Sequence, residues 1–470
     1  MNKPTLATAI FVALSVGLIG VPSAQFVARD PGLRGGPAGA GGPLNGLSHA
    51  QKAFFVAGLA DFAEREGIAD GLGPRFNLDS CGGCHLQPAN GGSSAAVNPQ
   101  VAIATFNGAR NVVPSFITKN GPVREARFVR NADGTPDGGV HALFVISGRN
   151  DNNGPGSDAS GCTAKQEDFD TQVRNKNVIF RIPTPTFGLG LIEQISDSDL
   201  VANQAAAAPQ KTALGIGGRF NRTRTSSTSS SISGEMNRSG NDGTITRFGW
   251  KAQNKSLLIF SGEAYNVEMG ITNDAFQNER DENPTCQFAS VPNDTVTDDR
   301  EASGAEARQA IELFTLFMRF SAAPTPSPDR PGGTASITNG RKVFENVGCA
   351  LCHTPTFNTS KMSAVSALRS KPVNLFSDLM LHAMGPGLAD GISQGAASGD
   401  EFRTAPLWGL GQRIFFLHDG RTNDLVEAIQ AHRSGANATY PASEANGVIN
   451  NYNSRSERDK QDLLNFLRSL

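Results

Sequence analysis

Apolar residues near the start of the chain recur at the three- and four-residue spacing of an amphipathic helix. Ser48 can cap this helix at its start, and Gln51 can close a capping box. The apolar face that follows consists of Phe54, Phe55, Leu59 and Phe62. The pattern therefore predicts a helix in this segment.

Helical spacing returns in three later segments of the chain. These are residues 305–320, 339–347 and 456–470. Between about residues 101 and 300 the pattern changes to short apolar runs, such as 140–146 and 178–182, separated by Gly, Pro and Asn. Such runs predict loops and a few strands.

A proline-rich segment divides the chain. Its four prolines, within residues 322–333, disfavour a helix and favour extended backbone. We place a linker at residues 326–337. The N-terminal domain is then 25–325, with an insertion at about 101–300, and the C-terminal domain is 338–470.

The first residues have the pattern of a secretory signal peptide. Lys3 supplies a positive charge, an apolar stretch runs from Leu6 to Val21, and small residues follow as far as Ala24. The apolar stretch is shorter than the roughly 20 residues that a membrane-spanning helix needs. We therefore predict a signal peptide at residues 1–24, export to the periplasm and no membrane span.

The charge of the chain is nearly balanced, with 42 basic and 44 acidic residues. Nucleic acids and anionic membranes attract proteins with an excess of positive charge. The composition therefore gives no support to nucleic acid as a partner.

The pattern Cys-x-x-Cys-His occurs twice. Its copies are Cys81-Gly-Gly-Cys84-His85 and Cys349-Ala-Leu-Cys352-His353. At this spacing two thiols lie one helical turn apart and can bond to the vinyl groups of haem, while the histidine binds the iron. A zinc site divided between the two pairs is the alternative, but each pair is followed directly by His. We predict two covalently bound c-type haems.

Each of these motifs follows a predicted helix, and each half of the chain ends on one. This order predicts a mainly α fold with two cytochrome-c-like haem domains, the first with a large irregular insertion. The remaining cysteines, Cys162 and Cys286, belong to neither motif. Export would permit a disulfide between them, with two free thiols as the alternative.

Several stretches resemble the bacterial di-haem oxidoreductase family, within the superfamily of di-haem cytochrome c peroxidases and MauG. They are residues 71–81, 247–252, 268–272, 402–408 and 416–420. The resemblance implies a reactive N-terminal haem and a C-terminal haem that relays electrons. Some members are described as thiol oxidoreductases, but this chain has no Cys-x-x-Cys pair beyond the two haem motifs.

The resemblance also implies roles for two residues near the first haem. Trp250 matches a tryptophan between the haems that relays electrons, and Glu268 matches the distal acid–base carboxylate that follows it. Without the resemblance, Trp250 would be interpreted as a core aromatic and Glu268 as a surface acid. A carboxyl beside haem can move a proton between the two oxygens of peroxide.

For the C-terminal haem, the resemblance implies a sixth ligand beyond the turn that contains His418. The peroxidases carry methionine at this position and MauG carries tyrosine, whereas this chain has His432. His432 shares a helical face with apolar residues, so its imidazole is directed towards apolar surroundings. Two histidine ligands would give a lower potential than histidine with methionine.

Other ligands compete with these. His382 and Met384 are alternatives for the C-terminal haem, and His141 is a candidate for the first. No histidine follows the first motif closely, so we predict an open first haem. Three arginines are candidate partners of the haem propionates, because guanidinium binds carboxylates in bidentate fashion. They are Arg75, Arg247 and Arg421.

The resulting hypothesis is a periplasmic oxidoreductase that reduces hydrogen peroxide. Its electrons would come from a small donor protein, a cytochrome c or a cupredoxin, and the resemblance allows calcium as a further cofactor. One alternative is an electron-transfer cytochrome with both irons fully ligated. Another is oxidation of a protein or organic substrate, as in MauG or the rubber oxygenases.

Overall fold

The structure is a computed structural model of the 470-residue chain, and it describes residues 1, 26–222, 244–278, 283–294 and 308–470. The predicted signal peptide therefore lies outside the described residues. The helices of the described part are α1 (His49–Ala63), α2 (Cys81–Cys84), α3 (Gln100–Ile103), α4 (Phe169–Arg174), α5 (Leu189–Glu193), α6 (Asp197–Ala205), α7 (Ala208–Leu214), α8 (Leu257–Met269), α9 (Ala310–Phe320), α10 (Gly333–Val347), α11 (Leu425–Ala431), α12 (Asn446–Asn453) and α13 (Glu457–Arg468).

The strands are short and all pair antiparallel. They are β1 (Arg75–Phe76) with β4 (Phe144–Val145), β2 (Glu125–Phe128) between β3 (Val140–His141) and β5 (Val178–Arg181), β6 (Phe357–Asn358) with β7 (Pro372–Val373), and β8 (Leu381–Ala383) with β9 (Glu401–Arg403). Of the described residues, 32% are helical and 11% lie in strands or bridges, so helix exceeds strand as predicted, whereas the two cytochrome-c-like haem domains stay a prediction.

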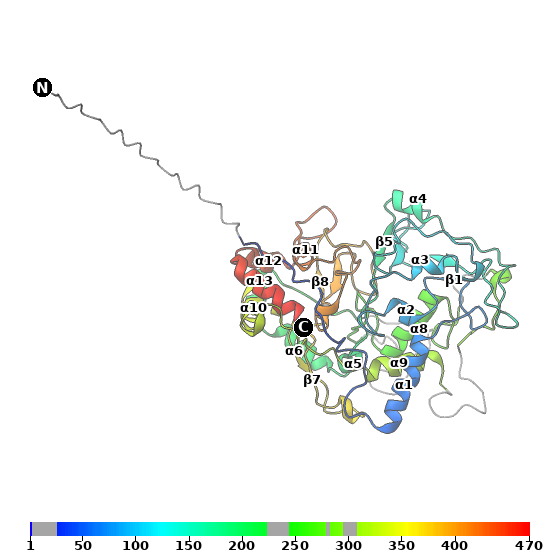
Figure 1. The fold of residues 1–470 in the computed structure, drawn as a ribbon, viewed down its shortest axis with the longest axis horizontal. Coiled ribbons are helices and arrows are strands. Elements are labelled where there is room, and N and C mark those ends of the chain that lie inside the picture. The colour runs from blue at the N-terminus through cyan, green and yellow to red at the C-terminus, as the bar shows by residue number, and fades with distance from the viewer. Residues whose placement is uncertain (2–25, 223–243, 279–282, 295–307) are drawn as a thin grey trace.

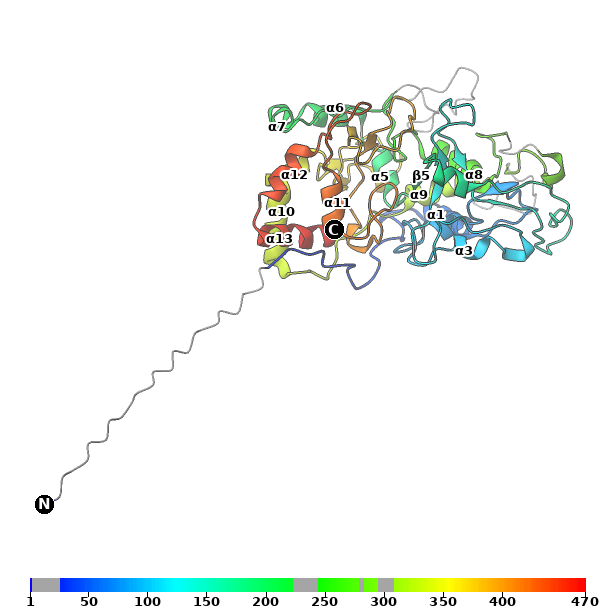
Figure 2. The ribbon, with the colours of Figure 1, turned by 90° about the horizontal axis from the view of Figure 1, so that it is seen from above.

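Two groups of helices lie apart in the molecule (Figures 1 and 2). In the first group α1 and α8 each pack on α9. In the second group, at one end of the molecule, α10 packs on α13 and contacts α12. Each group contributes to its own apolar core, the first including Phe62 and Phe317, the second Phe344 and Leu464.

The predicted domain boundary does not separate the two cores. Ala28 and Ile216, from the N-terminal part of the chain, pack in the second core. Leu375 and Trp408, from the C-terminal part, pack in the first. Each core therefore contains side chains from both sides of residues 326–337, and the division into two domains there stays a prediction.

Local signals in the sequence explain where several helices begin. Ser48 and Gln51 form the predicted capping box of α1. Ser456 caps α13, whose buried side chains include Leu463, Leu464 and Leu467. The runs at 140–146 and 178–182 contain β3, β4 and β5, as predicted.

The expected irregular insertion contains one long helix that the pattern did not reveal. Helix α8 buries side chains around most of its circumference, among them Leu257, Ile259 and Tyr265. A helix buried in this way lacks the apolar stripe by which an amphipathic helix is found. The structure also joins Cys162 to Cys286 by a disulfide. Among the helices of the described ranges, none has the length and apolar character to cross a membrane.

Candidate functional site: two cavities joined at a tryptophan

The first Cys-x-x-Cys-His motif lines a cavity in the N-terminal part of the molecule. Cys81 and Cys84 lie at the two ends of α2, and His85 follows it. The cavity holds about 1150 Å³ of space without protein atoms, part of it open to solvent. Both thiols lie outside the disulfide, so they can form thioethers.

The His85 ring is oriented as an iron ligand. Its Nδ1 lies 2.9 Å from the carbonyl oxygen of Gly92. A carbonyl only accepts, so this contact favours the tautomer with the hydrogen on Nδ1, in which Nε2 can bind a metal; the Thr184 carbonyl also lies near the ring. Burial lowers the pKa of His85 to about 4, which keeps the ring neutral at neutral pH. The residues present fit a haem.

The second motif repeats this arrangement in the C-terminal part. Cys349, Cys352 and His353 line a cavity of about 1420 Å³, part of it open to solvent. His353 Nδ1 lies 3.0 Å from the Phe376 carbonyl oxygen, and burial, together with nearby His432, lowers the pKa of His353 to about 4. Here too the Nε2 lone pair is left for a metal.

His432 lines the same cavity as His353. It follows directly after α11, and its Nδ1 lies 2.8 Å from the carbonyl oxygen of Ala428. Burial lowers the pKa of His432, so this ring too is neutral with an available Nε2. The structure thus brings the predicted pair of histidines into one cavity.

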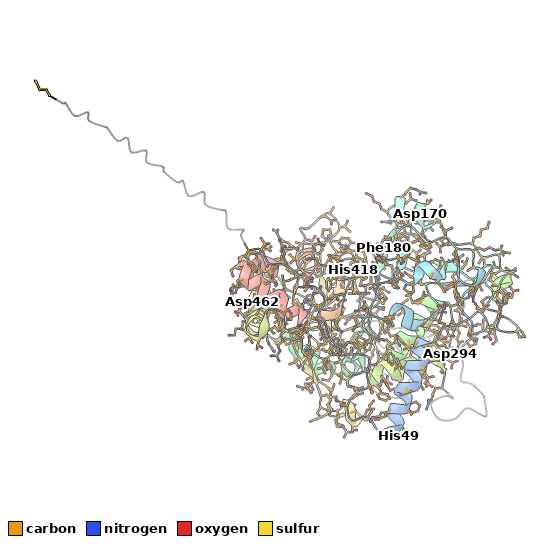
Figure 3. The ribbon with its side chains drawn as sticks, viewed as in Figure 1. His49, Asp170, Phe180, Asp294, His418 and Asp462 are labelled. Atoms are coloured by element: carbon orange, nitrogen blue, oxygen red, sulfur yellow. A yellow bond between two sulfur atoms is a disulfide. The ribbon has the colours of Figure 1, made fainter. Side chains whose placement is uncertain are left out.

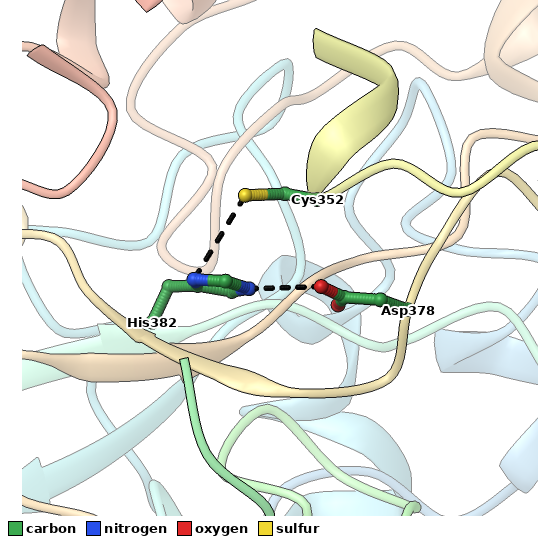
Figure 4. A group of neighbouring side chains, drawn as sticks. All are labelled: Cys352, Asp378 and His382. Atoms are coloured by element: carbon green, nitrogen blue, oxygen red, sulfur yellow. Dashed lines mark hydrogen bonds and ion pairs between the residues drawn. The ribbon is translucent and has the colours of Figure 1, made fainter. Parts of the chain in front are cut away.

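The competing histidines are held by carboxylates. His382 Nε2 lies 3.0 Å from Asp378, and its Nδ1 lies 2.7 Å from Glu444. Figure 4 shows His382 between Asp378 and Cys352, whose sulfur is 3.8 Å from Nδ1. His141 lies between Glu167 and Asp137 in the same way. Because both ring nitrogens of His382 and His141 form hydrogen bonds, neither imidazole is suited to bind iron in this conformation. Met384, the other competing ligand, does line the second cavity.

Trp250 lines both cavities, and of the described residues it alone does so. Its Nε1 donates to the Ile182 carbonyl oxygen at 2.9 Å. Its own carbonyl oxygen accepts from the Arg403 amide at 2.9 Å. Segments from both parts of the chain therefore hold the indole in place.

His418 lies beside this tryptophan on the side of the second cavity. Its ring stacks on Phe402 at 4.3 Å and lies 6.4 Å from Trp250. Figure 3 shows His418 in the middle part of the molecule, between Asp462 and Asp294. Its carbonyl oxygen accepts from the Ile182 amide at 2.8 Å, so this turn is tied to the segment that holds Trp250.

Glu268 faces the first cavity from the last turn of α8. Its Oε2 accepts from Asn77 Nδ2 at 2.7 Å, and its carboxyl also shares a hydrogen bond with Glu125. Burial, reinforced by the charge of Glu125, raises the pKa of Glu268 well above its usual range. Met269 lines the same cavity, with its sulfur 3.9 Å from that of Cys81.

The arginines that face the cavities differ from the three expected ones. Arg247 pairs with Asp197, and Arg421 pairs with Asp419 at 2.7 Å. Neither these two nor Arg75 lines a cavity. The arginines that do are Arg124, Arg127 and Arg181 in the first cavity, and Arg403 and Arg413 in the second.

Arg403 and Arg413 fit the carboxylates of a haem. Burial lowers the pKa of both to about 10. Their recorded partners are the carbonyl oxygens of Gly249 and Pro406, and no described carboxylate forms an ion pair with either. An anionic group in the cavity would compensate these buried charges.

Two cavities, each lined by a Cys-x-x-Cys-His motif, are what a protein with two haems requires. Residues 132–470 match the family model described as "Di-haem oxidoreductase, putative peroxidase". The match covers more than half of the chain, which therefore belongs to this family of di-haem oxidoreductases, as the resemblance predicted. The match begins beyond His85, so the assignment of the first motif as a haem site depends on its residues and its cavity alone.

Among the curated proteins, no match to the chain is found. Among solved structures, the chain is similar to hydrazine synthase of Kuenenia stuttgartiensis pressurised with xenon, at 20% identity and a TM-score of 0.22. The similarity covers 34% of this chain and 55% of that one. The chain thus spans about half the length of that structure.

Proposed function

We propose that this protein reduces hydrogen peroxide in the first cavity with electrons that enter through the second. The observation that carries the proposal is the position of Trp250, which forms part of both cavity walls. An aromatic side chain there gives electrons a route through protein between the two sites. The family of di-haem oxidoreductases supports the same reaction class.

In the proposal each cavity holds one c-type haem, which supplies an iron that binds peroxide or exchanges single electrons. The four motif cysteines attach the two groups, and His85 and His353 bind the irons. His432, which lines the same cavity as His353, would be the second protein ligand of that iron. Arg403 and Arg413 face the carboxylates of the second haem.

Glu268 is the proton donor of the first cavity. Burial and the charge of Glu125 raise its pKa, which favours the protonated form, so it can give a proton to the oxygen that leaves as water. Asn77 holds the carboxyl at 2.7 Å, which fixes its direction. Trp250 is oriented by Ile182, whose carbonyl accepts its hydrogen.

The location and the donor follow from the same proposal. The signal peptide at residues 1–24 directs the chain to the periplasm, where c-type haems are attached and disulfides form. A small cytochrome c or cupredoxin supplies the electrons.

Bound calcium stays a prediction that follows from the resemblance alone. Among the described residues, Cys352, Asp378 and His382 are close enough together to hold a metal ion, but this group includes a single carboxylate and does not resemble a calcium site.

Glu268→Gln tests the proposal. We expect kcat for peroxide, measured with reduced cytochrome c as donor, to fall by about 10²- to 10⁴-fold, because the proton donor is lost. Haem content should stay at two per chain. Glu167→Gln, away from both cavities, is the matched control and should keep full turnover. A wild-type protein with two haems and no spectral response to peroxide would contradict the proposal.

Met269 favours a second candidate, a cytochrome that only transfers electrons. Its thioether lines the first cavity and could bind the first iron, which would close the site to peroxide. Electron paramagnetic resonance of the oxidised protein separates the two. A high-spin signal from one iron is expected for the peroxidase, and two low-spin signals for the cytochrome.

A further inference from the structure

Two carboxyl groups from distant segments meet on the wall of the first cavity. Glu268 ends α8, Glu125 begins β2, and both line the cavity. Their side chains share a hydrogen bond. Two carboxyls can share such a bond only if one of them carries the proton.

Apart from Glu125, the side chain that hydrogen-bonds to Glu268 is a neutral amide, that of Asn77. Asn77 Oδ1 accepts from the Leu143 amide at 2.8 Å, so its Nδ2 must be the group that points at Glu268. Oε2 of Glu268 is thus an acceptor. Glu268 also lies at the carboxyl end of a helix, where the helix dipole disfavours negative charge.

The neighbours on the Glu125 side are cations. Arg127 Nε donates to Glu125 Oε1 at 2.6 Å, and Arg181 on the neighbouring strand adds positive charge. Arg127 is itself held by the Gly138 carbonyl oxygen at 2.9 Å. The remaining acid on α8, Glu263, is bonded to Asn254 and acts electrostatically on Arg127.

These surroundings assign the proton within the pair. Burial alone would raise the pKa of Glu125, but Arg127, the hydrogen bond with Glu268 and the charge of Arg181 together outweigh burial and lower that pKa. Burial and the charge of Glu125 raise the pKa of Glu268. At neutral pH Glu125 is the carboxylate and Glu268 the acid.

We propose that Glu125 and Glu268 act as one acid–base pair, in which Glu125 accepts a proton from peroxide while Glu268 donates one. This inference rests on the proposed function. The O–O bond breaks with two electrons from the donor protein, and the outer oxygen leaves as water with the proton of Glu268. The proton from the inner oxygen goes to Glu125 and then crosses the shared hydrogen bond to Glu268. The inner oxygen takes two protons from solvent and leaves as the second water.

The first test follows the carbonyl stretch of the protonated carboxyl by infrared spectroscopy of the haem-loaded protein without peroxide. Burial also raises the pKa of Glu66, to about 8, so its carboxyl contributes to the same region, and the band of the pair is the one that Glu268→Gln removes. In Glu125→Gln the band should titrate at a pH lower by about one unit or more, because the like charge is gone and Arg127 is no longer compensated. Glu263→Gln removes a charge from the same wall without touching the pair, so it should shift the titration less.

The second test is kinetic. Glu125→Gln should lower kcat for peroxide by about 10²-fold or more. The double variant should be no slower than the slower single variant, because the two groups act as a unit. Glu125→Asp keeps the charge and should restore part of the rate. Retained haem content and circular dichroism establish that each variant folds.

The outcomes separate this inference from the proposed function. An unshifted band in Glu125→Gln, or full turnover in that variant, would overturn the pair and leave the peroxidase proposal standing. A shifted band in a protein that never turns over peroxide would overturn the catalytic role of the pair together with the proposed function.

Discussion

The four imidazoles that line the second cavity differ in what their ring nitrogens contact. His353 and His432 each donate from Nδ1 to a backbone carbonyl oxygen and leave Nε2 available. His382 is held at both nitrogens by carboxylates, and His418 stacks on Phe402. These contacts favour His353 and His432 as the ligand pair of one iron.

We therefore predict that His432→Ala changes the second iron from six-coordinate low spin to high spin. Electron paramagnetic resonance of the oxidised protein measures this change directly. His382→Gln is the comparison: it should keep the low-spin signal but lower the free energy of unfolding, because buried Asp378 loses its partner. Identical spectra for wild type and His432→Ala would contradict the assignment.

The chain has two tryptophans, and only one of them joins the cavities. We expect Trp250→Phe to slow electron transfer between the haems by about tenfold, a change of about 1.4 kcal/mol in barrier. Stopped-flow spectroscopy of single-turnover oxidation measures the rate. Trp408→Phe, which changes a buried tryptophan away from the shared wall, should leave the rate unchanged.

Of the residues that line the cavities, the sequence predicts those that belong to a local motif or to a stretch resembling the family, and it misses the others. The two motifs, Trp250, Glu268 and His432 all reach a cavity wall. Asn77 was not found, because it lies 191 positions from Glu268 and meets it only in the folded chain. The cavity arginines were missed for the same reason.

Among the elements, α10 and α13 pack closely against each other in the second core. Gly340 of α10 faces the backbone of Asp462, so closely that an added Cβ would lie 1.9 Å from that carbonyl oxygen. Gly58 of α1 faces Leu313 of α9 in the same way, at 2.3 Å. In both pairs the missing side chain lets two backbones touch.

Gly340→Ala should therefore destabilise the protein, by about 1 to 3 kcal/mol, because the helices must move apart. Chemical denaturation of the haem-loaded protein measures the loss. Gly435→Ala is the matched control, since nothing lies within 4 Å of its added Cβ. Equal stability of the two variants would mean that α10 and α13 can separate at no cost.

Elements marked by surface periodicity or by a cap were predicted, as α1 and α13 show. Helix α8 was not, because its buried circumference removes the polar face. It carries Glu268, so an element that matters for the proposed chemistry had no amphipathic pattern to reveal it. Whether a helix is buried all round depends on what packs against it, and the local sequence does not contain that information.

Over the whole molecule, the disulfide between Cys162 and Cys286 closes a loop with a sequence separation of 124. A loop of this length contributes about 4 to 5 kcal/mol to stability in the chain-entropy model. We expect the double variant Cys162→Ser/Cys286→Ser to unfold at a lower temperature by calorimetry. Wild type treated with reductant should match it. An unchanged unfolding temperature would mean that the bridge does not restrict the unfolded chain.

The same bridge determines what a break in the backbone would do. Residues 223–243 lie between the two cysteines, and a single cut there would leave both pieces joined. One band would appear on a non-reducing gel and two on a reducing gel. His85 would be on one piece, and Trp250 and Glu268 on the other. The two walls of the first cavity would then remain a single covalent molecule only through that sulfur–sulfur bond.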